Sequence, residues 1–370
     1  MKIQGISGFA FKGNREIFDV HGHVGKMYDG MHGNKLMDYS VNNIISTVEP
    51  HNVKGVMVSS LSGLSALDSD IFQSEVDNAK EMAKLSGNEK VKLYPLISCQ
   101  PGISKDTSAI TQALESGEFY GMKFHPSNTN MPIKDNFEIY SQYMNLAQEK
   151  RLPSVFHSVT DGKSDPEQII KLAKKHPNHP VVLYHIDLMA NPEQMTKTID
   201  DISKAIKTGE ANLFVDISWL TGMGNNAETN KGILKQALEK IGENRIMFGS
   251  DTPISEMGTK EEYGKFVGFI ENTIKEFYKD KPEEAEKALN KIFSGNAENL
   301  FVNKTWAQPN SEEIFDLGQE ARKTIKNVKK EIKKSIHKGW FVVGGVVALG
   351  VGVLLDKFLI KKENSNPPKQ

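Results

Sequence analysis

The chain has 370 residues, of which 38% are hydrophobic and 25% charged, and its formal net charge at pH 7 is −1. This composition is typical of a globular protein with a sizeable core, and the balanced charge gives no indication of nucleic acid as a partner. Cys99 is the only cysteine, which excludes an intrachain disulfide, and residues 1–18 lack an apolar stretch of signal-peptide length, so we expect a cytoplasmic location.

From residue 17 onward the sequence repeats a short apolar run, a polar loop and an amphipathic stretch. Apolar runs that are nearly continuous are typical of parallel strands covered on both faces, and we expect one strand in each run. Eight repeats favour a closed (β/α)8 barrel over a doubly wound sheet, and no glycine-rich dinucleotide motif follows the first run. The expected strands are residues 17–20, 55–58, 92–97, 121–124, 153–156, 180–184, 213–217 and 245–248.

The amphipathic stretches between the runs are expected to form the helices of the barrel. Two further short helices are expected to end this domain, which we place at residues 1–305. Together these elements predict an α/β fold, a (β/α)8 TIM barrel with a C-terminal helical extension. The expected helices are residues 35–48, 71–85, 104–116, 136–150, 166–176, 192–208, 226–241, 259–278, 283–293 and 296–301.

The composition changes at the end of this domain. Residues 306–338 are interpreted as a linker and a lysine-rich amphipathic helix, which is expected to lie on an anionic membrane surface, to self-associate or to act as a spacer. Residues 339–355 form an uncharged run with five glycines, a residue commoner in membrane spans than in soluble helices. We therefore predict a transmembrane anchor at residues 339–360 and a polar tail at residues 361–370.

Two histidines, His21 and His23, follow the first apolar run in the motif DVHGH. Residues i and i+2 of a strand share a face, so both rings are expected to point into the mouth of the barrel, and Gly22 leaves room for a close backbone approach. Two imidazoles at this spacing suit adjacent positions on one metal ion. Asp19 shares their parity and is expected either to orient one ring or to satisfy backbone groups at the strand end.

Other candidate residues lie at the C-terminal ends of later runs, where the active sites of such barrels are built. His125 follows the fourth run, His157 the fifth and His185 the sixth, while Asp251 comes just after the eighth. We expect these four side chains to share the barrel mouth with the histidine pair.

In combination, the motifs DVHGH, GMKFHP and FGSDTP, with a strand-end histidine on the fifth and sixth runs, resemble the amidohydrolase superfamily. The resemblance is greatest to the amidohydrolase-related branch, which contains metal-dependent hydrolases and the relatives of aminocarboxymuconate-semialdehyde decarboxylase, and it covers residues 18–300. It implies that His185 binds a second ion or contacts the water or the substrate. The implied ligands of one divalent ion, usually Zn²⁺, are His21, His23, His157 and Asp251.

Lys123 leaves the number of ions open. It lies in the fourth run, from which binuclear relatives supply a carboxylated lysine that bridges two metal ions. In the branch that this sequence most resembles, a lysine in this motif accompanies a single ion and would bind a substrate carboxylate or polarise a carbonyl, so we favour one ion over two. His125 is expected to contact the substrate or to pack beside Pro126, and Trp219 to form an apolar wall of the pocket.

The implied ligand set leaves an open coordination position, where a water binds with its pKa lowered toward neutrality. Asp251 is placed to accept the proton of that water, and His185 and Lys123 are further catalytic candidates. We therefore predict a metal-dependent hydrolase that acts on a C–N or C–O bond of a small molecule, such as an amide, cyclic amide, lactone or ester.

Two alternatives stay open. The first is a nonoxidative, metal-dependent decarboxylase of a small unsaturated or aromatic acid, and the second is an inactive, membrane-tethered binding scaffold. The arginines weigh mildly against a dicarboxylate substrate, because none of them lies in a loop after an expected strand and an arginine clamp on a carboxylate is therefore not expected. These arginines are Arg15, Arg151, Arg245 and Arg322.

Removal of the predicted anchor is expected to release the protein from membranes, because the apolar run would no longer be available for insertion into the bilayer. We expect the full chain to sediment with membranes, and a chain that ends before Lys338 to stay in the supernatant after ultracentrifugation. A full-length chain found entirely in the supernatant would contradict the predicted anchor.

Overall fold

The computed structural model describes residues 15–29, 35–61, 90–99, 107–115, 117–188, 190–221 and 225–306, together with Met82 and Pro101. The chain divides into two units, Met1–Asn310 and Ser311–Gln370, and all described residues belong to the first unit.

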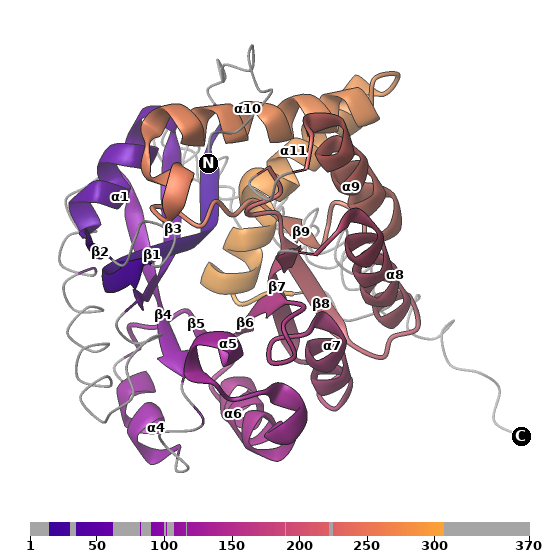
Figure 1. Cartoon of the computed structure of the whole chain (residues 1–370). Helices are drawn as coiled ribbons and strands as arrows, with labels where there is room; N and C mark the ends of the chain where they lie inside the picture. The colour runs from indigo at the N-terminus through magenta and orange to yellow at the C-terminus, as the bar shows by residue number, and fades with distance from the viewer. Residues whose placement is uncertain are drawn as a thin grey trace, which may run out of the picture. The chain divides into compact units, whose positions relative to one another are not determined.

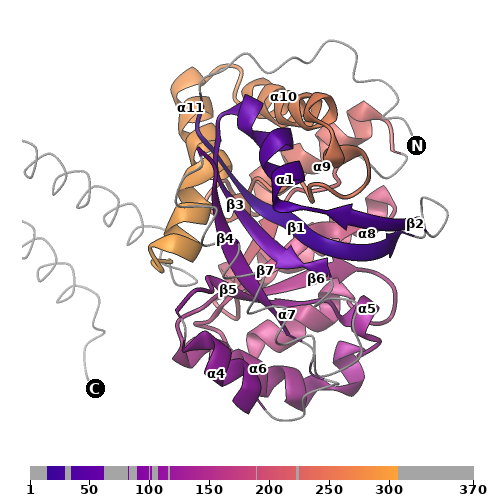
Figure 2. The ribbon, with the colours of Figure 1, turned by 90° about the vertical axis from the view of Figure 1, so that its left-hand side faces the viewer.

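Within the described residues, nine strands form one sheet in the order β2-β1-β3-β4-β5-β6-β7-β8-β9. All neighbouring pairs are parallel except β1 and β2, which form an antiparallel pair beyond the barrel (Figure 2). The eight parallel strands confirm the predicted (β/α)8 architecture. The strands are β1 (Ile17–Asp29), β2 (Lys35–Tyr39), β3 (Val53–Ser60), β4 (Lys92–Cys99), β5 (Gly121–Phe124), β6 (Ser154–Val159), β7 (Pro180–Leu188), β8 (Asn212–Asp216) and β9 (Ile246–Met247).

Helices lie around the outside of the strands (Figure 1). One of them begins with a capping box: Asn191 accepts a hydrogen bond from the Gln194 backbone (2.9 Å), and the Gln194 side chain accepts one from the Asn191 backbone (3.1 Å). Short 3-10 turns, η2 (Glu49–His51), η3 (Ile133–Asp135) and η4 (Ser255–Gly258), and two π-helical turns, η5 (Lys291–Gly295) and η6 (Glu298–Val302), complete the described elements. The α-helices are α1 (Val41–Val48), α4 (Ser108–Leu114), α5 (Pro126–Thr129), α6 (Phe137–Glu149), α7 (Pro166–Lys174), α8 (Pro192–Lys207), α9 (Ala227–Lys240), α10 (Lys260–Phe277) and α11 (Pro282–Asn290).

One expected helix is partly wrong. Residues 35–39, expected to begin a helix, form β2, and the helix α1 begins only after Ser40, whose side chain caps it by accepting from the Asn43 backbone at 3.3 Å. The strand forms because β1 continues past its expected end and pairs with it, from Gly25 opposite Tyr39 to Asp29 opposite Lys35. This pairing with a distant partner overrides the local helical pattern.

Several expected segments lie outside the described residues. These are most of the helix at 71–85, and the linker, lysine-rich helix, anchor and tail after Trp306. No helix within the described ranges is both long and apolar enough to cross a membrane. The predicted anchor at 339–360 therefore stays a prediction.

The core has two layers. The larger layer lies between the strands and the surrounding helices. The smaller layer fills the barrel, since its buried members among the described residues come from seven of the eight parallel strands and from Ala297, Leu300 and Phe301 near η6. The strand residues that do so are Phe18, Val20, Met57, Leu96, Val155, Val182, Tyr184, Phe214 and Met247.

The barrel closes between β1 and the segment after β9. The Val20 N–H donates to Phe248 O (3.0 Å), the His23 N–H to Thr252 O (2.8 Å), and the Asp251 N–H to His21 O (2.8 Å). Since β9 itself spans only two residues, these hydrogen bonds hold most of the seam.

Asp19 is a fully buried carboxylate at this seam. It accepts hydrogen bonds from the backbone N–H groups of His21 and Ser250 (3.0 Å each), from Ser250 Oγ (2.6 Å) and from the Tyr263 hydroxyl (3.0 Å). Burial raises the pKa of Asp19 to about 6. A register shift between Asp19 and Gly22 breaks the expected parity, so Asp19 does not face the histidine rings and instead satisfies groups at the strand end.

Substitution of Asp19 by Ala is expected to lower the free energy of unfolding by roughly 3 kcal/mol or more, because several buried donors would lose their acceptor. Tyr263→Phe, which removes only one of these hydrogen bonds, is expected to cost about 1 kcal/mol. Urea denaturation of both variants checks the ranking, and an equal loss in the two would show that Asp19 does not carry the seam.

Candidate metal centre

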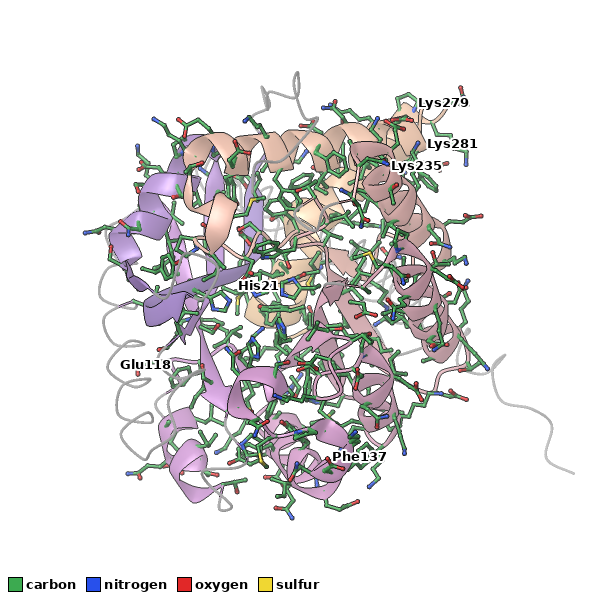
Figure 3. The ribbon with its side chains drawn as sticks, in the orientation of Figure 1. His21, Glu118, Phe137, Lys235, Lys279 and Lys281 are labelled. Carbon is green, nitrogen blue, oxygen red and sulfur yellow. The ribbon has the colours of Figure 1, made fainter. Side chains whose placement is uncertain are left out.

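His21 and His23 lie on the part of β1 that faces the barrel mouth, and both are almost fully buried. Their Nε2 atoms are 3.2 Å apart, and Asp251 Oδ1 lies 3.0 Å from His21 Nε2 and 2.9 Å from His23 Nε2. Gly22 has the expected role, since a Cβ on it would lie 2.8 Å from Val56 Cγ1 and would push β1 away from β3. Figure 3 shows His21 near the middle of the molecule.

Two of the three converging atoms, His21 Nε2 and Asp251 Oδ1, are acceptors. His21 Nδ1 lies 2.8 Å from Asp216 Oδ2, to which it donates, so the neutral His21 ring has no hydrogen on Nε2. Burial would raise the pKa of Asp251, but His21 and His23 outweigh it and hold that pKa well below its usual range. Burial likewise opposes the charged form of His21, yet Asp251 and Asp216 raise its pKa. A positive charge is therefore favoured at the metal corner, which is the space between His21 Nε2, His23 Nε2 and Asp251 Oδ1.

The separations fit one cation. Two ligand atoms that each lie 2.0–2.1 Å from a tetrahedral ion are about 3.3 Å apart. The Nε2 atoms of His21 and His23 and the Oδ1 atom of Asp251 are thus spaced as ligands of a single divalent ion would be, and all three residues are buried. The predicted ligands His21, His23 and Asp251 are brought together.

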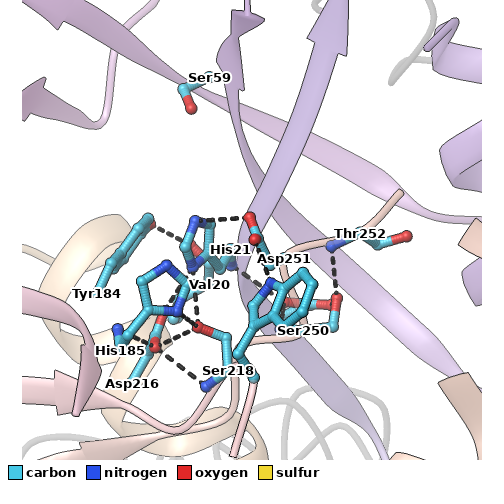
Figure 4. Close-up of polar contacts among 12 residues, drawn as sticks. Val20, His21, Ser59, Tyr184, His185, Asp216, Ser218, Ser250, Asp251 and Thr252 are labelled. Carbon is cyan, nitrogen blue, oxygen red and sulfur yellow. Dashed lines mark hydrogen bonds and ion pairs between the residues drawn. The ribbon is translucent and has the colours of Figure 1, made fainter. Parts of the chain in front are cut away.

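Asp216, the last residue of β8, is a site residue that the sequence analysis missed. Its Oδ2 accepts from His21 Nδ1, while its Oδ1 accepts from the His185 N–H (2.8 Å), the Ser218 N–H (3.1 Å) and Ser218 Oγ (2.6 Å), as Figure 4 shows. Burial would raise the pKa of Asp216, but His21 lowers it. Gly249 makes this position possible, because a Cβ there would lie 2.8 Å from Asp216 Oδ2.

His185 lies in an irregular end of β7. Between His157 and Val159 of β6, β7 advances from Tyr184 to Leu188, so it carries two extra residues in a bulge. His185 (φ 70°) and Asp187 (φ 60°) adopt the left-handed conformation that L side chains disfavour. Burial lowers the pKa of His185 to about 4, which keeps this ring neutral at pH 7.

The Asp187 carboxylate holds the bulge. It accepts hydrogen bonds from the Thr160 N–H (2.8 Å), Thr160 Oγ1 (2.9 Å) and Thr198 Oγ1 (3.1 Å). These bonds link the end of β7 to the loop after β6 and to α8, so the backbone that carries His185 is fixed from two sides.

Lys123 is the inward residue of β5, the one parallel strand of the described residues that adds no side chain to the apolar cluster inside the barrel. It is fully buried, and its Nζ has no hydrogen-bond partner among the described residues. The Nζ atom lies 3.8 Å from the centroid of the Tyr184 ring, whose other neighbour is the His21 ring at 3.9 Å. Burial lowers the pKa of Lys123 to about 7, against the opposing effect of Asp251 and Asp216.

His125 and His157 form a stacked pair, with ring centroids 3.8 Å apart and an interplanar angle of 13°. The His157 ring meets the His185 ring edge-on at 5.1 Å. Burial lowers the pKa of His125 and His157 well below the usual value. Neither group of close ligand atoms among the described residues includes His157, so its role as a metal ligand stays a prediction.

Trp219 contacts the metal corner directly. Its indole Nε1–H donates to Asp251 Oδ2, which leaves Asp251 Oδ1 to face the two histidines. The side chain also borders a small cavity beside His185. Trp219 is therefore more than the apolar wall expected from the sequence, because it also orients a candidate ligand.

Comparison with known proteins adds the family context. A family model described as amidohydrolase matches residues 97–302. No curated protein sequence matches the chain.

Solved structures share the fold at low identity. A probable 2-pyrone-4,6-dicarboxylic acid hydrolase from Acinetobacter baumannii, with citric acid bound, is 15% identical (TM-score 0.52; 78% of this chain and 99% of that chain covered). An amidohydrolase from Burkholderia multivorans is 13% identical (TM-score 0.55; 78% and 98%). A dihydroxybenzoic acid decarboxylase from Polaromonas sp. JS666, with bound manganese and the inhibitor 2-nitroresorcinol, is 15% identical (TM-score 0.53; 78% and 97%).

Substitution of Gly249 by Ala is expected to lower the affinity for Zn²⁺ by roughly 10–100-fold, because the new methyl group would displace Asp216 from His21 and disturb the orientation of that ligand. Competition with a chromophoric chelator measures the affinity. Gly232→Ala on α9 is the matched control, since a Cβ there meets no atom within 4 Å. Equal affinities in the two variants would contradict the positioning role of Asp216.

Proposed function

Because the chain belongs to the amidohydrolase family, we propose that it is a metal-dependent hydrolase that acts on a C–N or C–O bond of a small molecule, such as an amide, cyclic amide, lactone or ester. The observation that carries the proposal is the convergence of His21 Nε2, His23 Nε2 and Asp251 Oδ1 within 2.9–3.2 Å of one another. A divalent ion held there supplies Lewis acidity and lowers the pKa of a water that it binds.

We propose Zn²⁺ as the ion, on the strength of a ligand set of imidazoles and a carboxylate, with His157 as a further ligand. One ion is favoured over two, because Lys123, which a binuclear site would use as a bridge, rests with its Nζ against the Tyr184 ring. Burial and the absence of a protein acceptor for Lys123 Nζ among the described residues support a different role, as the cation that meets an anionic or carbonyl oxygen of the substrate.

The chain's own residues are suited to move a proton at this corner. Asp251 is ionised, with Oδ1 at the metal corner and Oδ2 held by the Trp219 indole, so it is a fixed acceptor for the proton of the attacking water. His185 is neutral and is a second acceptor close by. We place His125 beside the substrate, because it stacks on His157 at the mouth of the barrel.

A nonoxidative decarboxylase is the second candidate. It is supported by the buried Lys123 side chain, whose Nζ has no hydrogen-bond partner among the described residues and suits a substrate carboxylate, and by the similarity in fold to a dihydroxybenzoic acid decarboxylase. Two arginines of the described residues do not strengthen it: Arg15 lies before β1 and pairs with Glu286 (2.7 Å), and Arg245 lies buried before β9 against the Phe214 ring. We keep the predicted C-terminal anchor as part of the proposal, with the barrel on the cytoplasmic side.

The purified full chain is expected to contain about one Zn²⁺ per chain and to hydrolyse at least one member of a panel of lactones, cyclic amides and esters, since the corner favours a cation beside an ionised acceptor. Elemental analysis and product detection give the two readouts. The double variant with His21→Ala and Asp251→Asn should lose both, whereas His176→Ala, which removes a histidine bonded to Ser141 (2.8 Å), should lose neither.

A parallel panel of aromatic and unsaturated acids distinguishes the two candidates. Metal-dependent release of carbon dioxide without any hydrolysis would replace the hydrolase by the decarboxylase. A metal content that is the same in the double variant and in the unaltered chain would remove both, and would favour the binding scaffold.

A further inference from the structure

The hydroxyl group of Ser218 is the junction of a buried hydrogen-bond network. Ser218 Oγ lies 2.6 Å from Asp216 Oδ1, 2.7 Å from His185 Nδ1 and 3.1 Å from His21 Nδ1 (Figure 4). Every one of these side chains is at least 97% buried. Water therefore has little access to these contacts, and the protons must be distributed among the four side chains themselves.

The positions of the hydrogens on Ser218 and on the two imidazoles follow from the backbone N–H groups, which can only donate. The backbone N–H groups of His185 and Ser218 both point at Asp216 Oδ1, so this oxygen is an acceptor. A serine hydroxyl has one hydrogen and two lone pairs. The short contact to Asp216 uses the hydrogen, because an ionised carboxylate has none to offer.

Both imidazole contacts of Ser218 Oγ must then be donated by the rings. His185 carries its hydrogen on Nδ1 and donates it to Ser218, which leaves the Nε2 atom of that ring with a bare lone pair. His21 Nδ1–H is shared between Asp216 Oδ2 and Ser218 Oγ. With this assignment the serine hydroxyl donates its one hydrogen and accepts two. If the hydrogen pointed at either imidazole instead, the contact with Asp216 would have no hydrogen in it.

We infer that Ser218 is a positioning residue that fixes His185 as the Nδ1–H tautomer and so presents His185 Nε2 as a proton acceptor. The consequence for catalysis rests on the proposed function, in which His185 takes a proton during hydrolysis. Asp216 thus orients His21 by a direct hydrogen bond, and it orients His185 indirectly through the Ser218 hydroxyl. A single buried anion thereby sets the tautomers of two imidazoles on different strands.

A second metal position among His21, His185 and Asp216 is the competing interpretation, because their ligand atoms are close enough to hold an ion. The hydrogen bonds argue against it. Asp216 already accepts four hydrogen bonds, and the Nδ1 atoms of His21 and His185 are donors, so an ion bound there would have to displace hydrogens that hold the network together.

Nitrogen NMR of the full chain labelled with ¹⁵N-histidine tests the tautomer directly. Chelator-treated protein is used, so that no metal contributes, and the loss of one signal pair in His185→Gln assigns His185. The unaltered chain should show a protonated, pyrrole-type Nδ1 and a pyridine-type Nε2 for this residue. Ser218→Ala should lose this single state, with the Nε2–H form becoming populated.

Two further variants make the result decisive. Ser218→Cys, which nearly keeps the volume but hydrogen-bonds weakly, should give the same loss and replaces Ser218→Ala if that variant does not fold. Ser59→Ala removes another serine hydroxyl, 3.0 Å from His23 Nδ1, and should leave the His185 signals unchanged. An Nε2–H form in the unaltered chain, or His185 signals that do not change in either Ser218 variant, would overturn the inference.

The readout is independent of activity. A chain that binds no metal and hydrolyses nothing would refute the proposed function while still reporting the tautomer of His185. Conversely, an active hydrolase with the wrong tautomer would refute only the role of Ser218.

Discussion

The hydrogen-bonded seam between β1 and the segment after β9 is the interaction on which both the fold and the site depend. The same backbone bonds that close the barrel, from Asp251 N to His21 O and from His23 N to Thr252 O, bring the carboxylate beside the two imidazoles. Ligands separated by more than 220 positions in the sequence thus meet because the first and last strands are neighbours. Closure of the barrel therefore also brings the candidate ligands together.

The mouth of the barrel gathers buried charge and backbone strain. Lys123, Asp216 and Asp251 are buried there, and His185, Trp219 and Asp251 all have positive φ. A left-handed conformation costs an L residue roughly 1–2 kcal/mol, and a buried charge costs more unless it is paired. The surrounding hydrogen bonds offset these costs, and such concentrations of strain are typical of sites that bind or react.

Much of the barrel was predictable from the sequence, because its strands are local apolar runs and its helices have a clear period and recognisable starts. The strand β2 was not, since its partner is the extension of β1 and no local pattern shows that pairing. His21 and His23 were found, but their parity with Asp19 was misread, because a register shift intervenes between Asp19 and Gly22.

Asp216 and Ser218 were missed for a different reason: they form no motif, and their role appears only when the end of β8 comes close to His21 on β1 and His185 on β7. One signal was available for Asp216. It shares the inward face of β8 with Phe214, and an acidic residue on a face that is otherwise apolar needs a buried partner.

The floor of the barrel determines how much chain is needed for folding. Leu300 and Phe301 fill the interior from below, and Trp306 packs against the same cluster from beyond the expected boundary at residue 305. A shortened protein that ends before these side chains would keep every candidate ligand yet expose the inside of its barrel to water. A hydrophobic plug at the opposite end from the chemistry therefore extends the folded unit at least as far as Trp306.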